Sequence, residues 1–419
     1  MGTITSAARI WLTRSFQPFL FKNTYSNNLE YQNVEKPGLY IHIPFCRTIC
    51  DFCPYCKVLY DERMAEQYIN ALLKEIDMVG NMRGNERKEV SSLYFGGGSP
   101  ALLASNIKRI VGRINRHFII TDGIGLELHP YDVTEENLSI LKEAGVTKIS
   151  IGVQSFQPEY LHILGRSEFD SRAMFGALSK VPFETVSMDF IFTLPGQTIE
   201  LLKKDIESAF SSGANHIAVY PFIDFTFTNR NFTKMNNGEK KKLLYELVAY
   251  CESKGYVRDS IWTFSRHGTA KYSSMTRDNF IGFGCSATTL LKDIFKINTF
   301  DIPQYIKRVE GNELPTALTL QFTRRQRMVY YLFWTAYSMT VNSDAFKDFF
   351  SKSLENCYGF ELLLARIAGL IRKEKNEYVM TTRGAYYYHY FEHFYTLSYI
   401  DKMWNLMKND AFPKVLTIR

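Results

Sequence analysis

Short apolar segments alternate with segments of helical periodicity from residue 38 to residue 222. The apolar segments predict strands at 39–43, 93–95, 126–128, 148–153, 186–192 and 216–220. The segments between them predict helices, among them 63–79, 101–118, 135–144 and 200–211. Such alternation is typical of βαβ units, and therefore of a parallel sheet. About six units fit, fewer than the eight of a closed barrel, so we expect an α/β fold with a partial, open barrel.

Polar or conformationally special residues follow several of these strands at the point where each strand ends. They are the cysteine-containing loop after residue 43, the glycines at 96–98, and the side chains of Glu127, Gln154 and Asp189. Parallel α/β barrels bind their ligands at the carboxyl ends of their strands. We therefore expect a functional site at this edge of the sheet.

Four cysteines lie within eleven residues, at Cys46, Cys50, Cys53 and Cys56, whereas the other three are scattered along the chain. The spacing C-x3-C-x2-C of the first three suits a 4Fe–4S cluster, because cysteine thiolates hold such clusters. Three ligands would leave one iron free to bind a small molecule. Two alternatives stay open: a redox dithiol formed by Cys53 and Cys56, and a zinc site, although no second pair of closely spaced cysteines accompanies this one.

Composition limits the other classes of function. Hydrophobic residues make up 46% and charged residues 22% of the 419, which is typical of a soluble globular protein. No apolar run approaches the roughly 20 residues of a membrane span. The net charge of +7 is dispersed, so we expect a solvated surface and no nucleic-acid partner. Clustered free cysteines indicate a reducing compartment, and we expect a cytoplasmic protein.

The two ends of the chain differ from the alternating region. Residues 1–28 are basic and rich in Ser and Thr, which allows a targeting segment, but we expect an N-terminal arm that packs on the main domain. From about residue 311 the chain is mostly helical, and residues 369–384 predict a helix end followed by a hairpin, as in winged-helix folds. The aromatic residues at 386–391, with Phe394 and Tyr395, could line a pocket for a flat substrate or pack in the interior.

Six segments in order carry a family resemblance. They are Tyr40-Ile-His-Ile-Pro-Phe-Cys46 with Cys50, Phe52 and Cys53; Phe95-Gly-Gly-Gly-Ser-Pro100; Glu127-Leu-His-Pro130; Ile149-Ser-Ile-Gly-Val-Gln-Ser-Phe156 with Leu164-Gly-Arg166; Asp189 with Leu194-Pro-Gly-Gln-Thr198; and Ile281-Gly-Phe-Gly284. Over residues 38–290 the chain resembles the radical S-adenosylmethionine (SAM) enzymes. More narrowly, it resembles the family of oxygen-independent coproporphyrinogen III oxidase, with its heme-chaperone, heme-degrading and methyltransferase relatives.

The sequence pattern and the resemblance together predict a fold and a division of the chain. The resemblance implies a partial (β/α)6 TIM-like barrel of radical SAM type at residues 36–225, and the sequence pattern predicts an arm at 1–35 before it. Residues 226–310 would form an accessory segment that closes over SAM, and 311–419 a mainly helical, winged-helix-like C-terminal domain.

The resemblance also implies cofactors and their ligands. Cys46, Cys50 and Cys53 would ligate a 4Fe–4S cluster, and SAM would chelate the open iron. The implied SAM contacts are Tyr40 and Phe52 beside the cluster, Gly98 and Ser99 at the methionine part, Glu127, Gln154, Arg166 and Asp189 at the charged and ribose groups, and Ala287 at the adenosine. One electron would cleave SAM to methionine and a 5′-deoxyadenosyl radical. The implied electron donor is a flavodoxin or ferredoxin, and the implied substrate a tetrapyrrole or similar planar molecule.

The chain departs from the family where the reaction is decided. Coproporphyrinogen oxidases carry a further cysteine two positions after the third ligand, where this chain has Tyr55, followed by Cys56. Tyr55 and Cys56 are therefore our candidate catalytic residues. Pro54-Tyr55 and the segment Lys271–Arg277 are closer to the methyltransferase and heme-degrading relatives. We therefore expect methyl transfer, in which a second SAM would be the donor, or related C–H chemistry on a planar unsaturated substrate. Coproporphyrinogen decarboxylation and heme binding without turnover remain alternatives.

Overall fold

The computed structural model describes residues 2–24, 26–50, 52–83, 86–223, 225, 235–270 and 278–418. Within these residues, fourteen strands form one continuous sheet. Seven neighbouring strands of this sheet run parallel to one another. In spatial order they are β14 (Phe280–Phe283), β2 (Gly38–Ile43), β6 (Leu93–Gly97), β8 (Ile124–Leu128), β9 (Lys148–Gln154), β10 (Thr185–Phe192) and β11 (His216–Pro221).

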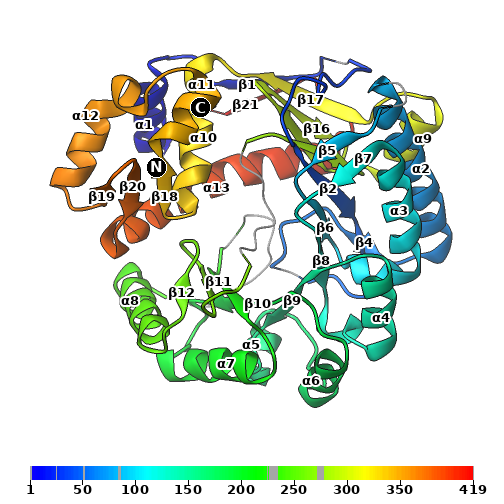
Figure 1. The fold of residues 1–419 in the computed structure, drawn as a ribbon, viewed down its shortest axis with the longest axis horizontal. Helices are drawn as coiled ribbons and strands as arrows, with labels where there is room; N and C mark the ends of the chain where they lie inside the picture. The colour runs from blue at the N-terminus through cyan, green and yellow to red at the C-terminus, as the bar shows by residue number, and fades with distance from the viewer. Residues whose placement is uncertain are drawn as a thin grey trace.

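The parallel strands form an arc with helices on its outer side (Figure 1). The outer helices are α2 (Glu62–Gly80), α3 (Ala104–His117), α4 (Glu135–Glu143), α6 (Ser171–Lys180) and α7 (Ile199–Ser211). α2 shows why they pack there. Its side chains at 65, 68, 69, 72, 73 and 76 are buried, which is one face of a helix, and Asp61 caps its first turn by accepting from the backbone N–H of Met64.

The arc does not close, because its two ends pair with antiparallel strands rather than with each other. β11 is followed by β13 (Thr263–Ser265) and β12 (Val257–Arg258). β14 is followed by β15 (Thr288–Leu291), β16 (Ile294–Asn298) and β17 (Thr316–Gln321). The predicted α/β class and the partial barrel are thus confirmed.

Both ends of the chain join this sheet. β1 (Phe19–Lys22) lies between β17 and β21 (Val415–Ile418) and pairs antiparallel with both. The preceding helix α1 (Gly2–Thr13) packs against α10 (Arg324–Tyr337). The two termini accordingly lie near each other in Figure 1.

The C-terminal part is mainly helical and contains the predicted hairpin. β19 (Ile371–Glu374) and β20 (Glu377–Met380) form it, and β18 (Thr340–Asn342) adds a third strand. α11 (Ser343–Phe350) and α12 (Leu354–Ile367) precede the hairpin, and the long α13 (Thr382–Asn409) follows it. No helix among the described residues is long and apolar enough to cross a bilayer. The domain boundaries expected from the sequence remain predictions.

Candidate functional site

The cysteine loop projects from the carboxyl end of β2. At its base, β3 (Phe45–Cys46) pairs with β4 (Val58–Leu59), and the backbone N–H of Tyr60 donates to the carbonyl of Cys46 at 2.9 Å. The loop is therefore held at both ends, so the positions of its cysteines are defined by the sheet.

The thiols of Cys46, Cys50 and Cys53 have the surroundings of cluster ligands. Burial, together with the neighbouring thiols, raises the pKa of Cys46 to about 12, and burial also raises the pKa of Cys53. A cation close to these two sulfurs would favour their thiolate forms.

Two glycines at the end of β6 bring backbone against this loop. Gly97 has φ +123°, in the region that favours glycine. A Cβ on Gly98 would lie 2.5 Å from the carbonyl oxygen of Phe45 and 2.9 Å from Sγ of Cys46. The loop and the strand end therefore fit together only without a side chain at residue 98.

Glu127 lies at the end of β8, the next strand along. Its carboxylate accepts hydrogen bonds from the hydroxyl of Tyr94 at 3.1 Å and from the backbone N–H of Gly97 at 3.2 Å. Burial raises its pKa. The hydroxyl of Tyr40 on β2 lies on the same side, since a Cβ on Gly96 would be 3.1 Å from it and 3.2 Å from Glu127.

Asp189, on β10, is a second carboxylate at this edge of the sheet. The hydroxyl of Ser150 donates to both its oxygens, at 2.9 and 3.0 Å, and burial together with the charge of Glu127 raises its pKa to about 7. A carboxyl group held in this way would gain from a cationic ligand such as a sulfonium. Gln154, at the end of β9, has φ +68° beside a register shift between β9 and β10.

Arg166 connects this edge to the cysteine loop. Its Nε donates to Sγ of Cys50 at 3.3 Å, another guanidinium nitrogen donates to the carbonyl of Gly152, and its charge lies 5.8 Å from the ring centre of Phe52. The structure thus brings Arg166 and Phe52 to the expected cluster site and leaves guanidinium N–H groups for a carboxylate.

Two expected contacts are placed differently in detail. The hydroxyl of Ser99 donates to Asp132 at 2.6 Å, and Arg47 pairs with the same carboxylate at 3.0 Å. The backbone of Ser99 is engaged as well: its N–H donates to the carbonyl of Phe45 at 2.8 Å, and its carbonyl accepts from the N–H of Leu102 at 3.0 Å. Ala287 is 2% exposed and lies in the turn between β14 and β15, with its Cβ 3.0 Å from the position a Cβ on Gly282 would take.

Several residues of the site were not singled out from the sequence. Tyr94 and Ser150 hold the two carboxylates, and Arg47 with Asp132 holds the loop against the end of β6. Tyr94 stands two residues before the glycines, and Ser150 pairs with Glu127 across β8 and β9. Ser150 could have been identified from the sequence only if the register of β8 against β9 had been known.

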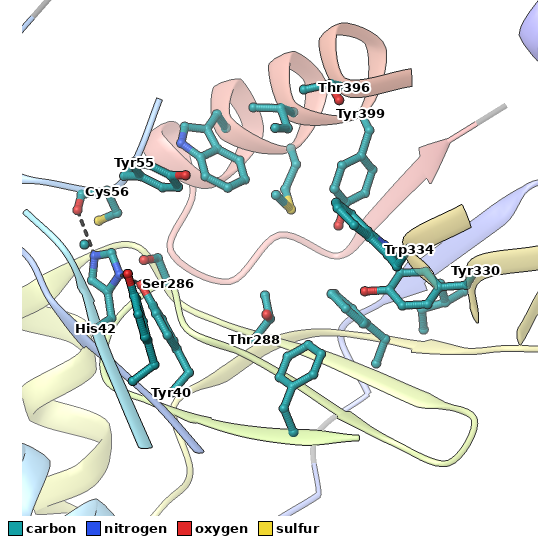
Figure 2. Close-up of a pocket in the computed structure, with 18 of the residues that line it drawn as sticks. Tyr40, His42, Tyr55, Cys56, Ser286, Thr288, Tyr330, Trp334, Thr396 and Tyr399 are labelled. Carbon is teal, nitrogen blue, oxygen red and sulfur yellow. Dashed lines mark hydrogen bonds between the residues drawn. The ribbon is translucent and has the colours of Figure 1, made fainter. Parts of the chain in front are cut away.

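A cavity of about 310 Å³ opens beside these residues (Figure 2). Tyr40, His42, Gly97 and Glu127 line one end of it, together with Tyr55 and Cys56. The rest of the wall is largely aromatic and comes from separate elements: Phe19 and Phe21 of β1, Phe280 of β14, Phe295 of β16, Tyr330 and Trp334 of α10, and Tyr399 and Trp404 of α13. Its volume lies at the lower end of the roughly 300–1,000 Å³ of small-molecule sites.

The aromatic run before this part of α13 lies elsewhere. Tyr386 and Tyr388 pack on the hydrophobic core, and Tyr390 and Phe391 are exposed. The side chains of Phe394 and Tyr395, and the whole segment 271–277, lie outside the described residues. Residues 386–391 therefore do not line the cavity, and among the described side chains of α13 the first on its wall is Thr396.

Comparisons with known proteins agree with this geometry. Residues 40–209 match the Radical SAM superfamily. Heme chaperone HemW of Bacillus subtilis is 27% identical over 362 residues, which cover 82% of this chain and 95% of that protein. Oxygen-independent coproporphyrinogen III oxidase of Escherichia coli is 26% identical over 317 residues, covering 68% and 69% of the two chains. The solved structure of E. coli coproporphyrinogen III oxidase (HemN) has a TM-score of 0.76 and 21% identity, covering 91% and 97%.

The expectation of methyl transfer finds no support in these comparisons. None of the three proteins is named a methyltransferase. That expectation rested in part on Pro54-Tyr55, which resembles the methyltransferases at two residues only. Over most of its length the chain is similar to HemN and HemW.

The family implies a 4Fe–4S cluster and SAM as cofactors, and the residues present fit both. Three free thiols lie on one loop, a glycine backbone lies against one of them, and two carboxylates with raised pKa values lie at the same edge of the sheet. The motifs, the fold and the comparisons agree: residues 40–209 match the Radical SAM superfamily, and the chain as a whole is similar to oxygen-independent coproporphyrinogen III oxidase and to HemW.

Proposed function

We propose that this radical SAM protein binds a planar, conjugated molecule of the tetrapyrrole type in the aromatic cavity and carries out C–H chemistry on it. The observation that carries the proposal is the continuity of the cavity with the cofactor site. One wall contains Tyr40, His42 and Glu127, and the opposite walls contain Trp334, Tyr399 and Trp404. Flat aromatic walls suit a flat, apolar ligand.

The bound cluster and SAM would supply a radical able to abstract hydrogen from carbon; the protein would supply position and exclusion of water. Cys46, Cys50 and Cys53 would hold the cluster. Glu127 and Asp189 would place negative charge and hydrogen-bond acceptors around the sulfonium and ribose.

At the other end of SAM, Arg166 would pair with the carboxylate. Phe52 and the backbone of Gly98 and Ser99 would confine the methionine part. Gln154 and Ala287 would border the adenosine, and Tyr55 and Cys56 would meet the substrate.

The charged residues of the cavity wall limit how many carboxylates a bound ligand can carry. Among the described residues that line it, none is lysine or arginine. A coproporphyrinogen carries four carboxylates, which this wall could not pair, so they would have to extend out of the cavity. A ring with fewer carboxylates, such as a heme, matches the wall better.

Heme binding without turnover is the second candidate. It is favoured by the match to HemW, which extends over 95% of that protein, against 69% of the E. coli oxidase. The cavity would then store heme. The cluster and SAM would control heme binding and would not react with the heme.

The test begins with anaerobic reconstitution of the full chain. SAM and dithionite are added with hemin or coproporphyrinogen III, and products are read by mass spectrometry. We expect 5′-deoxyadenosine together with a mass change of the tetrapyrrole, and neither product from Cys46→Ala. Stoichiometric hemin binding without 5′-deoxyadenosine would favour storage. Carbon dioxide from coproporphyrinogen III would identify the decarboxylase. Absence of binding to either tetrapyrrole would contradict the assignment of the cavity.

A further inference from the structure

Two cysteines that are distant in the sequence meet beside the cofactor site. Cys56 ends the cysteine cluster, and Cys285 follows β14 in the Gly284-Cys-Ser286 turn. Their sulfurs and a ring nitrogen of His42 lie within 4.8 Å of one another, and all three residues are buried. Neither cysteine belongs to the three-cysteine set that fits the cluster.

The arrangement does not suit a metal ion, because His42 already uses both ring nitrogens. Nδ1 shares a hydrogen bond with the hydroxyl of Tyr40 at 3.0 Å, and Nε2 shares one with the carbonyl of Cys56 at 2.8 Å. Since a carbonyl can only accept, Nε2 carries the proton and Nδ1 accepts from Tyr40. What remains is a pair of thiols in contact.

Hydrogen bonds hold the backbone on both sides of the pair. The N–H of Cys285 donates to the hydroxyl of Tyr68 at 3.0 Å, and the N–H of Gly284 donates to Glu75 at 2.8 Å. His42 holds the carbonyl of Cys56 on the other side. The thiol of Cys56 donates to the carbonyl of Phe300 at 3.3 Å and also contacts the side chains of Cys285 and His42.

The two thiols differ in character and in access. Contact with Cys285 and His42 lowers the pKa of Cys56, whereas burial raises the pKa of Cys285. Cys56 lines the aromatic cavity and also a second cavity that contains Phe300 and Met407, so a small molecule can reach it from either side. A thiol with a lowered pKa that borders two cavities, next to a fully buried thiol, is the arrangement of a nucleophilic and a resolving cysteine.

We propose that Cys56 and Cys285 form a reversible disulfide by exchange with low-molecular-weight disulfides. The thiolate of Cys56 attacks one sulfur of the small disulfide and releases the first small thiolate. Cys285 gives its proton to solvent and attacks Sγ of Cys56, which releases the second small thiolate. The protein pair loses two electrons, and the small disulfide gains them.

The bond would join the cysteine loop to the turn between β14 and β15. That turn carries Ser286 on the cavity wall and Ala287 beside it (Figure 2). Oxidation would therefore fix one wall of the cavity relative to the loop that carries the cluster ligands. The structure of the substrate site would then depend on the ratio of small disulfides to thiols around the protein.

The test uses the anaerobically reconstituted full chain and cystamine, a small disulfide. After treatment the protein is denatured in acid, its free thiols are alkylated, and unreduced tryptic peptides are analysed by mass spectrometry. We expect a peptide pair linked through Cys56 and Cys285, unchanged iron content, and recovery of both alkylated peptides after dithiothreitol.

Matched variants separate this pair from other thiols. Cys285→Ser is expected to stop at a mixed disulfide of Cys56 with cysteamine, and Cys251→Ser, which alters another buried cysteine, should leave the link intact. If Cys285→Ser does not fold, the peptide map of the unaltered protein decides alone. Two free thiols after cystamine treatment, a persistent mixed disulfide in the unaltered protein, or a link to any other cysteine would overturn the proposal.

Discussion

The backbone of Gly98 passes so close to the cysteine loop that no side chain fits between them. A Cβ there would meet the carbonyl of Phe45 at 2.5 Å and the sulfur of Cys46 at 2.9 Å. Backbone cannot swing away as the end of a flexible side chain can. One missing methyl group thus defines how the loop that carries the expected cluster ligands sits on the sheet.

Gly98→Ala should therefore weaken both the fold and the cluster site. We expect a loss of about 1–3 kcal/mol in the free energy of unfolding, because overpacking forces the backbone apart, and a lower iron content after reconstitution. Thermal unfolding and iron analysis check this. Gly112→Ala is the control, since a Cβ there meets nothing within 4 Å. Equal behaviour of the two variants would contradict the close approach.

Cys53 and Cys56 should behave differently although they are three residues apart. We expect Cys53→Ala to lower retained iron at least about tenfold, since even outer contacts of a metal site cost that much. Cys56→Ala should keep its iron, because its sulfur faces Cys285 and Phe300. Iron and sulfide analysis after reconstitution decides the matter. Comparable iron loss in Cys56→Ala would make Cys56 a ligand.

At the scale of elements, α2 is fastened to the strands beyond the barrel by one buried carboxyl group. Glu75 accepts from the hydroxyl of Tyr305 on α9 (Ile302–Glu310) at 2.7 Å and from the N–H of Gly284 at 2.8 Å. Asn298 on β16 donates to its other oxygen at 3.3 Å. An outer helix, the end of a parallel strand and an antiparallel strand thus meet at one side chain.

This carboxyl group should make stability depend on pH. Burial raises the pKa of Glu75 to about 7, above its usual value of 4.5, so the folded protein binds the proton more tightly than the unfolded chain does. The free energy of unfolding should therefore fall as pH rises from 4.5 to 7 and be level above that, by about 3 kcal/mol for this group.

Glu75→Gln should remove this part of the pH dependence. Urea unfolding of both proteins between pH 5 and 8 measures it: the variant should gain relative to the unaltered protein as pH rises. Glu246→Gln, on the surface of α8 (Asn237–Ser253), is the control. Parallel stability curves for Glu75→Gln and the unaltered protein would show that Glu75 does not titrate in this range.

At the scale of the whole molecule, the cavity is a product of chain ends meeting the barrel. β1 from the start of the chain and β21 from its end extend the sheet beyond β17. α10 and α13 then cover that side and contribute Trp334 and Trp404. The expected cofactor residues lie mostly on β2, β6, β8, β9 and β10, whereas the aromatic wall combines β1, β14, β16, α10 and α13, so neither part makes a site alone.

Replacing Trp334, in the cavity wall, should lower the affinity for a tetrapyrrole, whereas replacing Trp11, outside the cavity, should not. Trp334→Ala is expected to weaken hemin binding roughly tenfold or more, because buried aromatic anchors contribute about 2 kcal/mol or more. Trp11→Ala is the matched control: this side chain is 52% exposed and packs on Phe360, outside the cavity. Absorbance titration with hemin measures both. Equal affinities would place the tetrapyrrole elsewhere.

The features that could be predicted from the sequence are those that depend on residues close together in the chain. The alternating strands and helices, the triple glycine and the three cluster cysteines depend on neighbours in the sequence, and β2, β6 and α2 begin and end within a few residues of the predicted ranges. Glu127 and Asp189 were recognised because they follow strands, and parallel strands end at one edge.

Contacts between distant segments explain the rest. The sequence by itself determined the α/β class, the resemblance to radical SAM enzymes and the cysteines suited to a cluster, since each is encoded in local periodicity or short motifs. Only the tertiary structure placed Ser150 against Asp189, showed that the later turns of α13 rather than residues 386–391 line the cavity, and set Cys285 against Cys56. The physical reason is that strand register and helix packing are decided by the summed burial of many side chains, which no single motif contains.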